Sequence, residues 1–332
     1  MFRAALAICI STILCATSNA SGNKIIIAYQ TGPDPIEVLI ANGEIVKITG
    51  RQVEFRRFNS GADILAAIAS GDVQVGYVGS SPFAAAASRG LDVKAFYIPS
   101  ISGTDEALVV RDGSGINSPA DLKGKRLSAA PVSTDHYQLL ATLKQNGIAE
   151  KEATVLPLPQ PEIVAAWKRG DLDAAFVWDP ALSELKKSSH VLLTSKQVAE
   201  RGAPTFNAWV ASGTFVKSEP DFLKTFAALV AKQNTSFLTD KAAWSEDSAN
   251  VKTIAGLLGG TPKDQAAALR DLNILPADQQ GTDIWLGGGE RSGVASILKE
   301  TAGFLKAQKK TTAVRDSYAD YVTAAFVPPL SQ

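Results

Sequence analysis

The chain has 332 residues, and its 33 basic residues are matched by 33 acidic ones. With 45% hydrophobic and 7% aromatic residues, the composition is that of an ordinary globular protein, which excludes an intrinsically disordered chain. The length predicts two domains or one core divided into two lobes. Because the charges are balanced, we expect no nucleic acid and no anionic membrane as a partner.

The N-terminus has the pattern of a secretory signal peptide. Arg3 supplies a positive charge, residues 4–15 form a short apolar run, and Ala20 ends a stretch of small residues. The run falls short of the roughly 20 residues that span a membrane, so we expect cleavage after Ala20 and export to the periplasm. Cleavage would remove Cys9 and Cys15, the only cysteines, which excludes disulfide bonds and cysteine catalysis in the mature protein.

Short strands and helices alternate along the first half of the chain, which indicates an α/β protein. Residues 24–29 form a β-branched run and predict a buried strand that opens a parallel sheet. From Phe222 onward, amphipathic helices predict a scaffold. Between these segments, we expect helices near 36–40, 62–70 and 131–145, a short capped helix that runs into a strand at 118–127, and strands at 53–58, 73–78 and 106–111.

One structural unit occurs twice in the sequence. Residues 64–76 and 163–175 each predict a helix, a Gly-Asp stop and a strand. Each strand then leads into a polar cluster with a proline, Gly79–Pro82 in the first copy and Trp178–Pro180 in the second. Ligands of open α/β sheets bind beyond the carboxyl ends of the strands, so both clusters are expected at a cleft between two facing lobes.

Motifs of the common enzyme classes are absent from the sequence. It has no G-x-S-x-G elbow, no phosphate-binding G-x-x-x-x-G-K-[ST] loop, no H-E-x-x-H and no G-x-G-x-x-G. Its two histidines, His136 and His190, would leave a zinc ion dependent on carboxylates. We therefore expect a protein that is not an enzyme and that holds neither a metal nor a cofactor.

Hydroxyl and glycine clusters stand at the start of three predicted helices, at residues 59–61, 79–81 and 133–134. Helix N-termini present free N–H groups and a partial positive charge, so three of them facing one cleft would bind an anion without a basic side chain. The alternative is that each hydroxyl only caps its own helix. His136, beside the third cluster, is a candidate ligand contact.

Several large aromatic and acidic residues could lie either at the predicted cleft or in a structural role. Trp167 lies within a helix among alanines and is expected in the core. Trp178 and Trp209 fit a cleft wall and the core equally well. Glu106, at a predicted crossover, is either a hinge salt-bridge partner or a carboxylate that reads a cation.

Motifs along nearly the whole mature chain resemble those of the taurine-binding proteins of bacterial ABC importers. The resemblance rests on Ala28–Thr31, Phe58–Ala62, Ala69–Gly76, Gly79–Pro82, Glu106–Val110, Asp121–Arg126, Ser133–Tyr137, Ala165–Asp171, Val177–Trp178, Gly202–Thr205 and Asp320–Val322.

The resemblance implies a two-lobed periplasmic binding protein of type 2, with two crossovers and a ligand cleft between the lobes. Residues 24–106 and 208–329 would form lobe 1, and residues 107–207 would form lobe 2. The protein would be a monomer that captures taurine or a related aliphatic sulfonate. It would deliver this ligand to the permease and ATPase subunits of an ABC importer.

The resemblance also implies the ligand contacts. The sulfonate would meet Gln30 and the helix starts, the ammonium would meet an acidic residue, and the two methylenes would pack on tryptophan. The residues implied are Gln30, Ser60, Ser80 and Ser81 for the sulfonate, Glu106, Asp135 or Asp179 for the ammonium, Trp178 and Trp209 for the methylenes, and Thr134, His136 and Asn207 around them.

Two positions depart from the family pattern. Related proteins carry Asp at the position of Asn207 and a small residue at the position of Asp179. The carboxylate that reads the ammonium has therefore moved, or the preferred ligand lacks an ammonium. The same fold binding a sulfate ester or a thiamine-pyrimidine precursor remains an alternative, and a periplasmic enzyme is a third.

Overall fold

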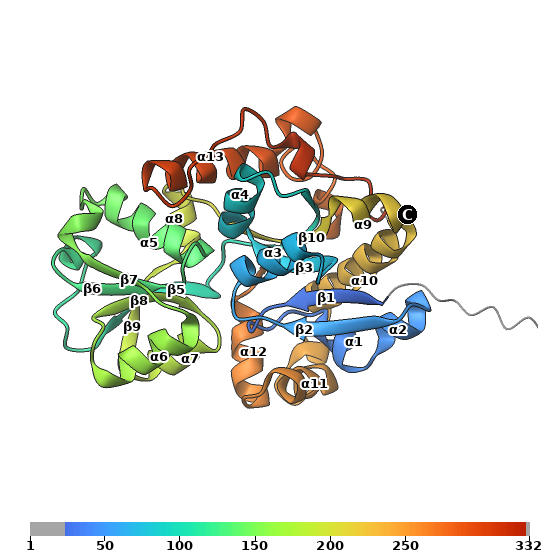
Figure 1. Cartoon of the computed structure of the whole chain (residues 1–332). Helices are drawn as coiled ribbons and strands as arrows, with labels where there is room; N and C mark the ends of the chain where they lie inside the picture. Colours follow the sequence, from blue (N-terminus) through green and yellow to red (C-terminus); the bar gives the residue numbers. More distant parts are fainter. Residues whose placement is uncertain (1–23, 330–332) are drawn as a thin grey trace, which may run out of the picture.

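The computed structural model describes residues 24–329, so the predicted signal peptide lies outside the described residues. Two sheets organise this part of the chain into two lobes (Figure 1). The sheet of lobe 1 has six strands in the order β11-β4-β10-β3-β1-β2, and that of lobe 2 has five in the order β7-β6-β8-β5-β9. The α/β class is confirmed. No helix in this part of the chain is long and apolar enough to cross a membrane.

The sheet of lobe 1 is mixed, whereas the sequence predicts a parallel sheet. Strands β1 (Ile25–Tyr29), β2 (Val53–Arg57) and β3 (Val75–Gly79) are parallel, but β10 (Phe206–Ser212) is antiparallel to β3 and β4 (Val93–Ile101). The chain leaves lobe 1 at the end of β4 and returns at the same edge, so β10 must run the opposite way. The short β11 (Asn273–Ile274) completes the sheet beside β4.

The sheet of lobe 2 follows the same logic. Strand β5 (Glu106–Arg111) enters from the cleft and is antiparallel to β8 (Ala174–Trp178) and β9 (Ser189–Thr194). Strand β6 (Arg126–Ala129) is parallel to β7 (Thr154–Pro157) and β8. Glu106 thus belongs to the sheet of lobe 2, and Asn207, on β10, to the sheet of lobe 1.

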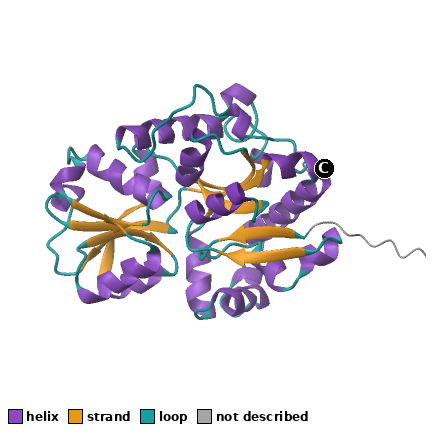
Figure 2. Cartoon of the chain, in the orientation of Figure 1, coloured by secondary structure: helices purple, strands orange, loops and turns teal. Residues whose placement is uncertain are grey.

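Helices cover both faces of the lobe 2 sheet (Figure 2). Successive residues of β5 point to opposite faces, as a pleated strand requires. Leu108 and Val110 pack in the cluster under α5 (Thr134–Gln145), and Ala107 and Val109 pack in the cluster under α6 (Gln160–Arg169) and α7 (Ala181–Leu185). Because β5 is apolar on both faces, it reads as a continuous hydrophobic run in the sequence.

The repeated unit of the sequence is confirmed in the structure. Helix α3 (Gly61–Ser70) precedes β3, and α6 precedes β8. Gly71 and Gly170 end these helices with φ values of 85° and 80°, which a side chain would strain. Each strand therefore leaves a glycine turn at the outer edge of its lobe and delivers its carboxyl end to the cleft.

Most of the remaining helices surround lobe 1, whereas α8 (Ser195–Glu200) packs on α5 and β9 in lobe 2. Helix α13 packs on α4, and Phe304 near its end meets Tyr137 of α5 edge to face, with ring centroids 5.0 Å apart (Figure 1). The other helices are α1 (Glu37–Ala41), α2 (Glu44–Thr49), α4 (Ser80–Ser88), α8 (Ser195–Glu200), α9 (Gly213–Ser218), α10 (Pro220–Thr239), α11 (Ala249–Leu258), α12 (Pro262–Asp271) and α13 (Gly293–Ala307).

Trp167 and Trp209 both lie in the core. Trp167 is 3% exposed, as expected, and the guanidinium of Arg111 stacks 4.3 Å from its ring centroid. Trp209 is fully buried against Phe226 of α10, so its assignment to the cleft wall is wrong. It follows Asn207 by two residues on β10 and therefore lies about 7 Å deeper in the sheet, away from the cleft edge.

We expect Phe226→Ala to lower the free energy of unfolding by about 3–5 kcal/mol, because the ring is fully buried against Phe96, Trp209 and Phe222. Urea denaturation measures the loss. Leu238→Ala, on the same helix but 37% exposed, is the matched control and should change stability by only about 0.5 kcal/mol. Equal losses in the two variants would contradict this view of the core.

Candidate functional site

A small cavity lies between the lobes and is lined by residues of both. Its volume of about 60 Å³ is far below the roughly 300–1,000 Å³ of sites for drug-sized ligands, so it suits a compact molecule. Strand ends supply much of the wall: Gln30 follows β1, Gly79 ends β3, Glu106 begins β5, Trp178 ends β8 and Asn207 lies near the start of β10. Helix α12 contributes Ala268 and closes one side.

Three helix N-termini meet at this cavity. Gly61 is the first residue of α3, Gly79 is the N-cap of α4, and Ser133 is the N-cap of α5; all three line the cavity. The first N–H groups of a helix have no acceptor within it, and the helix dipole makes them partly positive. No lysine or arginine lines the cavity, so these helix starts are its source of positive potential.

The serine hydroxyls at these helix starts are engaged elsewhere. Ser60 accepts from the Asp63 N–H at 3.2 Å and caps α3, Ser80 accepts from the Phe206 N–H at 3.4 Å, and Ser81 donates to the Val132 carbonyl at 2.9 Å. None of the three lines the cavity. The serine contacts expected for an anion are therefore not part of the cavity wall, and the three hydroxyls bond within the protein instead.

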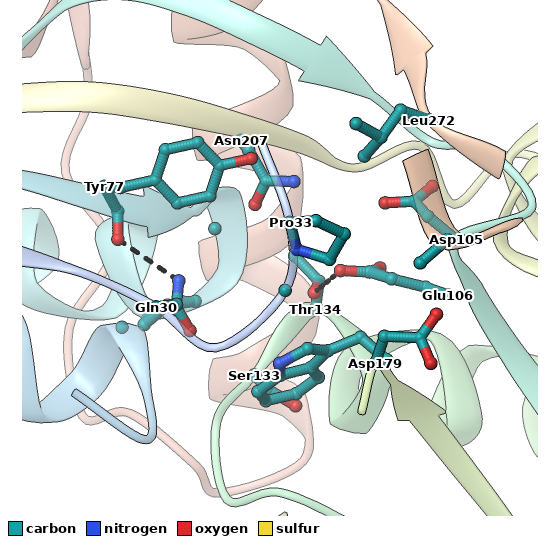
Figure 3. A pocket seen from close by; sticks show the side chains of 16 residues that line it. Gln30, Pro33, Tyr77, Asp105, Glu106, Ser133, Thr134, Asp179, Asn207 and Leu272 are labelled. Atoms are coloured by element: carbon teal, nitrogen blue, oxygen red, sulfur yellow. Dashed lines mark hydrogen bonds between the residues drawn. The ribbon is translucent and has the colours of Figure 1, made fainter. Parts of the chain in front are cut away.

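Acidic residues gather on one side of the cavity. Figure 3 shows Asp105, Glu106 and Asp179 on this side and Gln30 with Tyr77 on the other. Glu106 accepts from the Thr134 hydroxyl at 2.7 Å, and burial raises its pKa to about 7. Asp179 accepts from the Ser183 N–H at 2.9 Å, and burial raises its pKa as well.

Asp105 and Tyr77 line the cavity but were missed by the sequence reasoning. Asp105 stands in the connection between β4 and β5, where no motif marks it; its only signal is that it precedes Glu106 directly. The Tyr77 hydroxyl lies 3.4 Å from Ser100 Oγ. Asn207 Nδ2 also donates to Ser100 Oγ, at 3.2 Å. Tyr77 lies within an apolar strand, so the sequence alone predicted that its side chain belongs to the hydrophobic core.

Asp135 and His136 lie behind the cavity wall and do not line it. Both are buried, at 0% and 3% exposed. His136 Nδ1 accepts from the Val132 N–H at 3.0 Å, and burial lowers its pKa to about 4, so the ring is neutral. Direct ligand contact was the wrong expectation for both, since the first turn of α5 points these side chains into lobe 2.

The two lobes touch directly around the cavity. Trp178 Nε1 of lobe 2 donates to the Thr31 hydroxyl of lobe 1 at 3.2 Å, and Ser81 donates to Val132 across the same gap. Gly79 and Thr134 approach so closely that a Cβ on Gly79 would lie 2.8 Å from Thr134 Cγ2. The structure thus shows the lobes closed on the cavity.

No group of three or more His, Cys, Asp and Glu side chains within residues 24–329 has an arrangement that could hold a metal ion.

Comparison with known proteins places the chain in a family. Residues 49–239 match the model of the NMT1/THI5-like family. The taurine-binding periplasmic protein of Escherichia coli is 38% identical over 308 residues, which cover 93% of this chain and 94% of that protein.

Two solved structures share the fold. The alkanesulfonate-binding protein of Xanthomonas axonopodis pv. citri, solved with MOPS bound, has a TM-score of 0.73 at 21% identity and covers 93% of this chain and 99% of its own. The periplasmic aliphatic sulphonate-binding protein of Escherichia coli has a TM-score of 0.71 at 20% identity and covers 91% and 98%. The chain has the fold of periplasmic binding proteins and belongs to the NMT1/THI5-like family.

Proposed function

We propose that this protein is the solute-binding subunit of an ABC importer and that it captures taurine or a closely related aliphatic sulfonate between its lobes. It is not an enzyme: it binds the ligand and returns it unchanged. The signal peptide, cleaved after Ala20, directs it to the periplasm, where it acts as a monomer and delivers its ligand to the permease and ATPase subunits. The 38% identity to a taurine-binding protein supports this function.

The observation that carries the proposal is the opposed polarity of the cavity. Carboxylates stand on one side, and Gln30 with Tyr77 stands on the other (Figure 3); the starts of α3 and α4, Gly61 and Gly79, also line the cavity. Gly61 lies beside Gly79, since a Cβ on Gly61 would be 3.5 Å from the Gly79 N atom. Gln30 Nε2 donates to the carbonyl of Tyr77, which precedes Gly79 by two residues on β3. Taurine has the same opposition, with a sulfonate and an ammonium separated by two methylenes.

The sulfonate is held by N–H groups at the starts of α3 and α4. The Gln30 amide uses one hydrogen for Tyr77 and keeps the second for the ligand. Fixed dipoles of this kind stabilise an anion without the cost of ordering a long basic side chain. Trp178, whose indole N–H is already bonded to Thr31, presents its ring to the methylenes.

The ammonium is held by Glu106. Asp179 also lines the cavity, and burial raises its pKa, but the hydrogen bond from Ser183 and the charge of Lys186 partly offset that rise, whereas Glu106 takes part in no salt bridge among the described residues. Glu106 therefore gains more from a cationic ligand than Asp179 does. Asn207, uncharged and bonded to Ser100, serves as a neutral wall.

Binding of taurine to the purified mature protein is the direct test. Thermal shift against taurine, ethanesulfonate, a sulfate ester and a thiamine-pyrimidine precursor should show the largest stabilisation for taurine. At a hundredfold excess over Kd, the expected gain is about 2.7 kcal/mol. Preference for the pyrimidine, or turnover of the ligand over hours, would overturn the proposed function.

Glu106→Gln should weaken taurine about 10- to 100-fold, because a charged hydrogen bond contributes about 1.5–3 kcal/mol. Ethanesulfonate, which lacks the amine, should bind the variant as well as it binds the wild type. Calorimetry of both ligands measures the difference. Asp179→Asn is the matched comparison and should cost taurine less; equal losses for the two ligands in both variants would show that neither carboxylate reads the ammonium.

Gly79→Ala should weaken every ligand without unfolding the protein. The φ of Gly79 is −75°, which alanine adopts freely, but the new methyl group would separate Gly79 from Thr134 and hold the lobes apart. Small-angle scattering with saturating taurine should report a larger radius of gyration than for the wild type. Gly303→Ala, on α13 with open space around it, is the control and should bind normally. Full closure of the Gly79 variant would contradict the role given to this contact.

A further inference from the structure

Three carboxyl groups form a buried cluster at the crossover between β4 and β5. Asp105 and Glu106 are consecutive, and Asp135 reaches them from the first turn of α5. Asp135 is 0% exposed and Glu106 is 9% exposed. Asp105 Oδ1 and both carboxyl oxygens of Asp135 are buried and receive no hydrogen bond from any donor in the described part of the chain.

The cluster has no basic counterion among the described residues. None of its three members takes part in a salt bridge there. The surrounding elements add negative or neutral groups: Asp179 after β8, the Tyr77 hydroxyl on β3, and the neutral His136 on α5. At the end of α12, Asp271 is already paired with Lys186 at 3.7 Å.

Three carboxylates at one buried site cannot all be ionised, because each charge loses hydration and repels the others. Burial raises the pKa of Asp135 well above its usual value, and Glu106 and Asp105 raise it further. Burial and Glu106 raise the pKa of Asp105 in the same way. Glu106 accepts a hydrogen bond from Thr134, and burial raises its pKa to about 7. At mildly acidic pH, the free cluster therefore carries protons.

We infer that capture of an ammonium ligand at Glu106 expels a proton from this cluster, with Asp135 as the buried neighbouring carboxyl whose charge favours the protonated form of Glu106 in the free protein. The inference rests on the proposed function, since it assumes a ligand with a cationic end. In the exchange, the protonated carboxyl loses its proton to water, and the ligand's ammonium replaces it as the positive charge beside the carboxylate. Asp135, which lies outside the cavity, acts through Glu106 and is a positioning residue.

The sign of the pH dependence follows. Below pH 7, the ligand must displace a proton, so taurine affinity rises by up to about tenfold per pH unit from pH 5 to pH 7. Above pH 7, Glu106 is ionised in the free protein, and the affinity levels off. Ethanesulfonate brings no cation to replace the proton, so its affinity does not rise over the same range.

Isothermal titration at pH 6, in two sulfonate-free buffers of different ionisation enthalpy, such as cacodylate and bis-tris, counts the protons released. We expect close to one proton released per taurine and none per ethanesulfonate. Asp135→Asn, which keeps the shape of the side chain but removes its charge, should release less than half as much and bind taurine equally well at pH 6 and pH 8. Asp221→Asn, at an exposed carboxylate on α10, should behave as the wild type.

Equal taurine affinity of the wild type at pH 6 and pH 8, or an unchanged proton count in Asp135→Asn, would overturn the inference. If the variant does not fold, the number of protons that the wild type releases per bound taurine still tests the inference.

A ligand-free measurement separates this inference from the proposed function. Groups whose pKa is raised by folding stabilise the protein at low pH, and this contribution is lost as the pH rises through about 7. The loss begins at about pH 4, where carboxyl groups of the unfolded chain ionise, so Asp135→Asn should gain stability relative to the wild type as the pH rises from about 4 to 8, with the largest gain at pH 8. Absence of taurine binding at every pH would contradict the proposed ligand but not the buried proton. An unchanged pH dependence of stability in Asp135→Asn would contradict the presence of a buried proton in the cluster.

Discussion

Both crossovers join the two sheets at the edge that faces the cleft, and the rest of the structure depends on this constraint. The chain leaves β4 at Ile101 and enters β5 at Glu106, and it returns to lobe 1 on β10 from Phe206. Because these connections are short, the residues that link the lobes also line the cavity. A ligand that contacts Glu106 therefore acts on the hinge itself, so binding and closure are parts of one event.

The electrostatics of the cavity follow from the same arrangement. Strand ends and helix starts converge where the crossovers meet, which places helix N–H groups at one side without any basic side chain. The other side carries carboxyl groups that lack a basic partner among the described residues. A ligand with only an anion would leave these carboxyl groups uncompensated in a buried site. Under the proposed function, selection of a zwitterion would come from the cost of leaving either side unmatched.

The sequence predicted the elements well where local chemistry decides them. The β-branched run at residues 25–29, the glycine stops at Gly71 and Gly170 and the capped start of α5 all appear in the structure where expected. The same reasoning assigned the wrong partners to Ser81 and Trp209. A hydroxyl at a helix start can cap, bridge or bind, and only the approach of Val132 from the other lobe gave Ser81 its acceptor.

The sequence by itself determined the α/β class, the repeated unit and the set of strand ends and helix starts that the cleft uses, because these depend on local periodicity, capping and turn residues. Length and the repeated unit indicated two lobes, and the family resemblance added the two crossovers between them. Tertiary structure alone decided the antiparallel course of β10, the depth of Trp209 and the meeting of Asp105, Glu106 and Asp135. Packing of β5 against α5 brings Asp105 and Glu106 close to Asp135, which lies about thirty residues later in the chain. Local sequence patterns do not determine the distance between such residues.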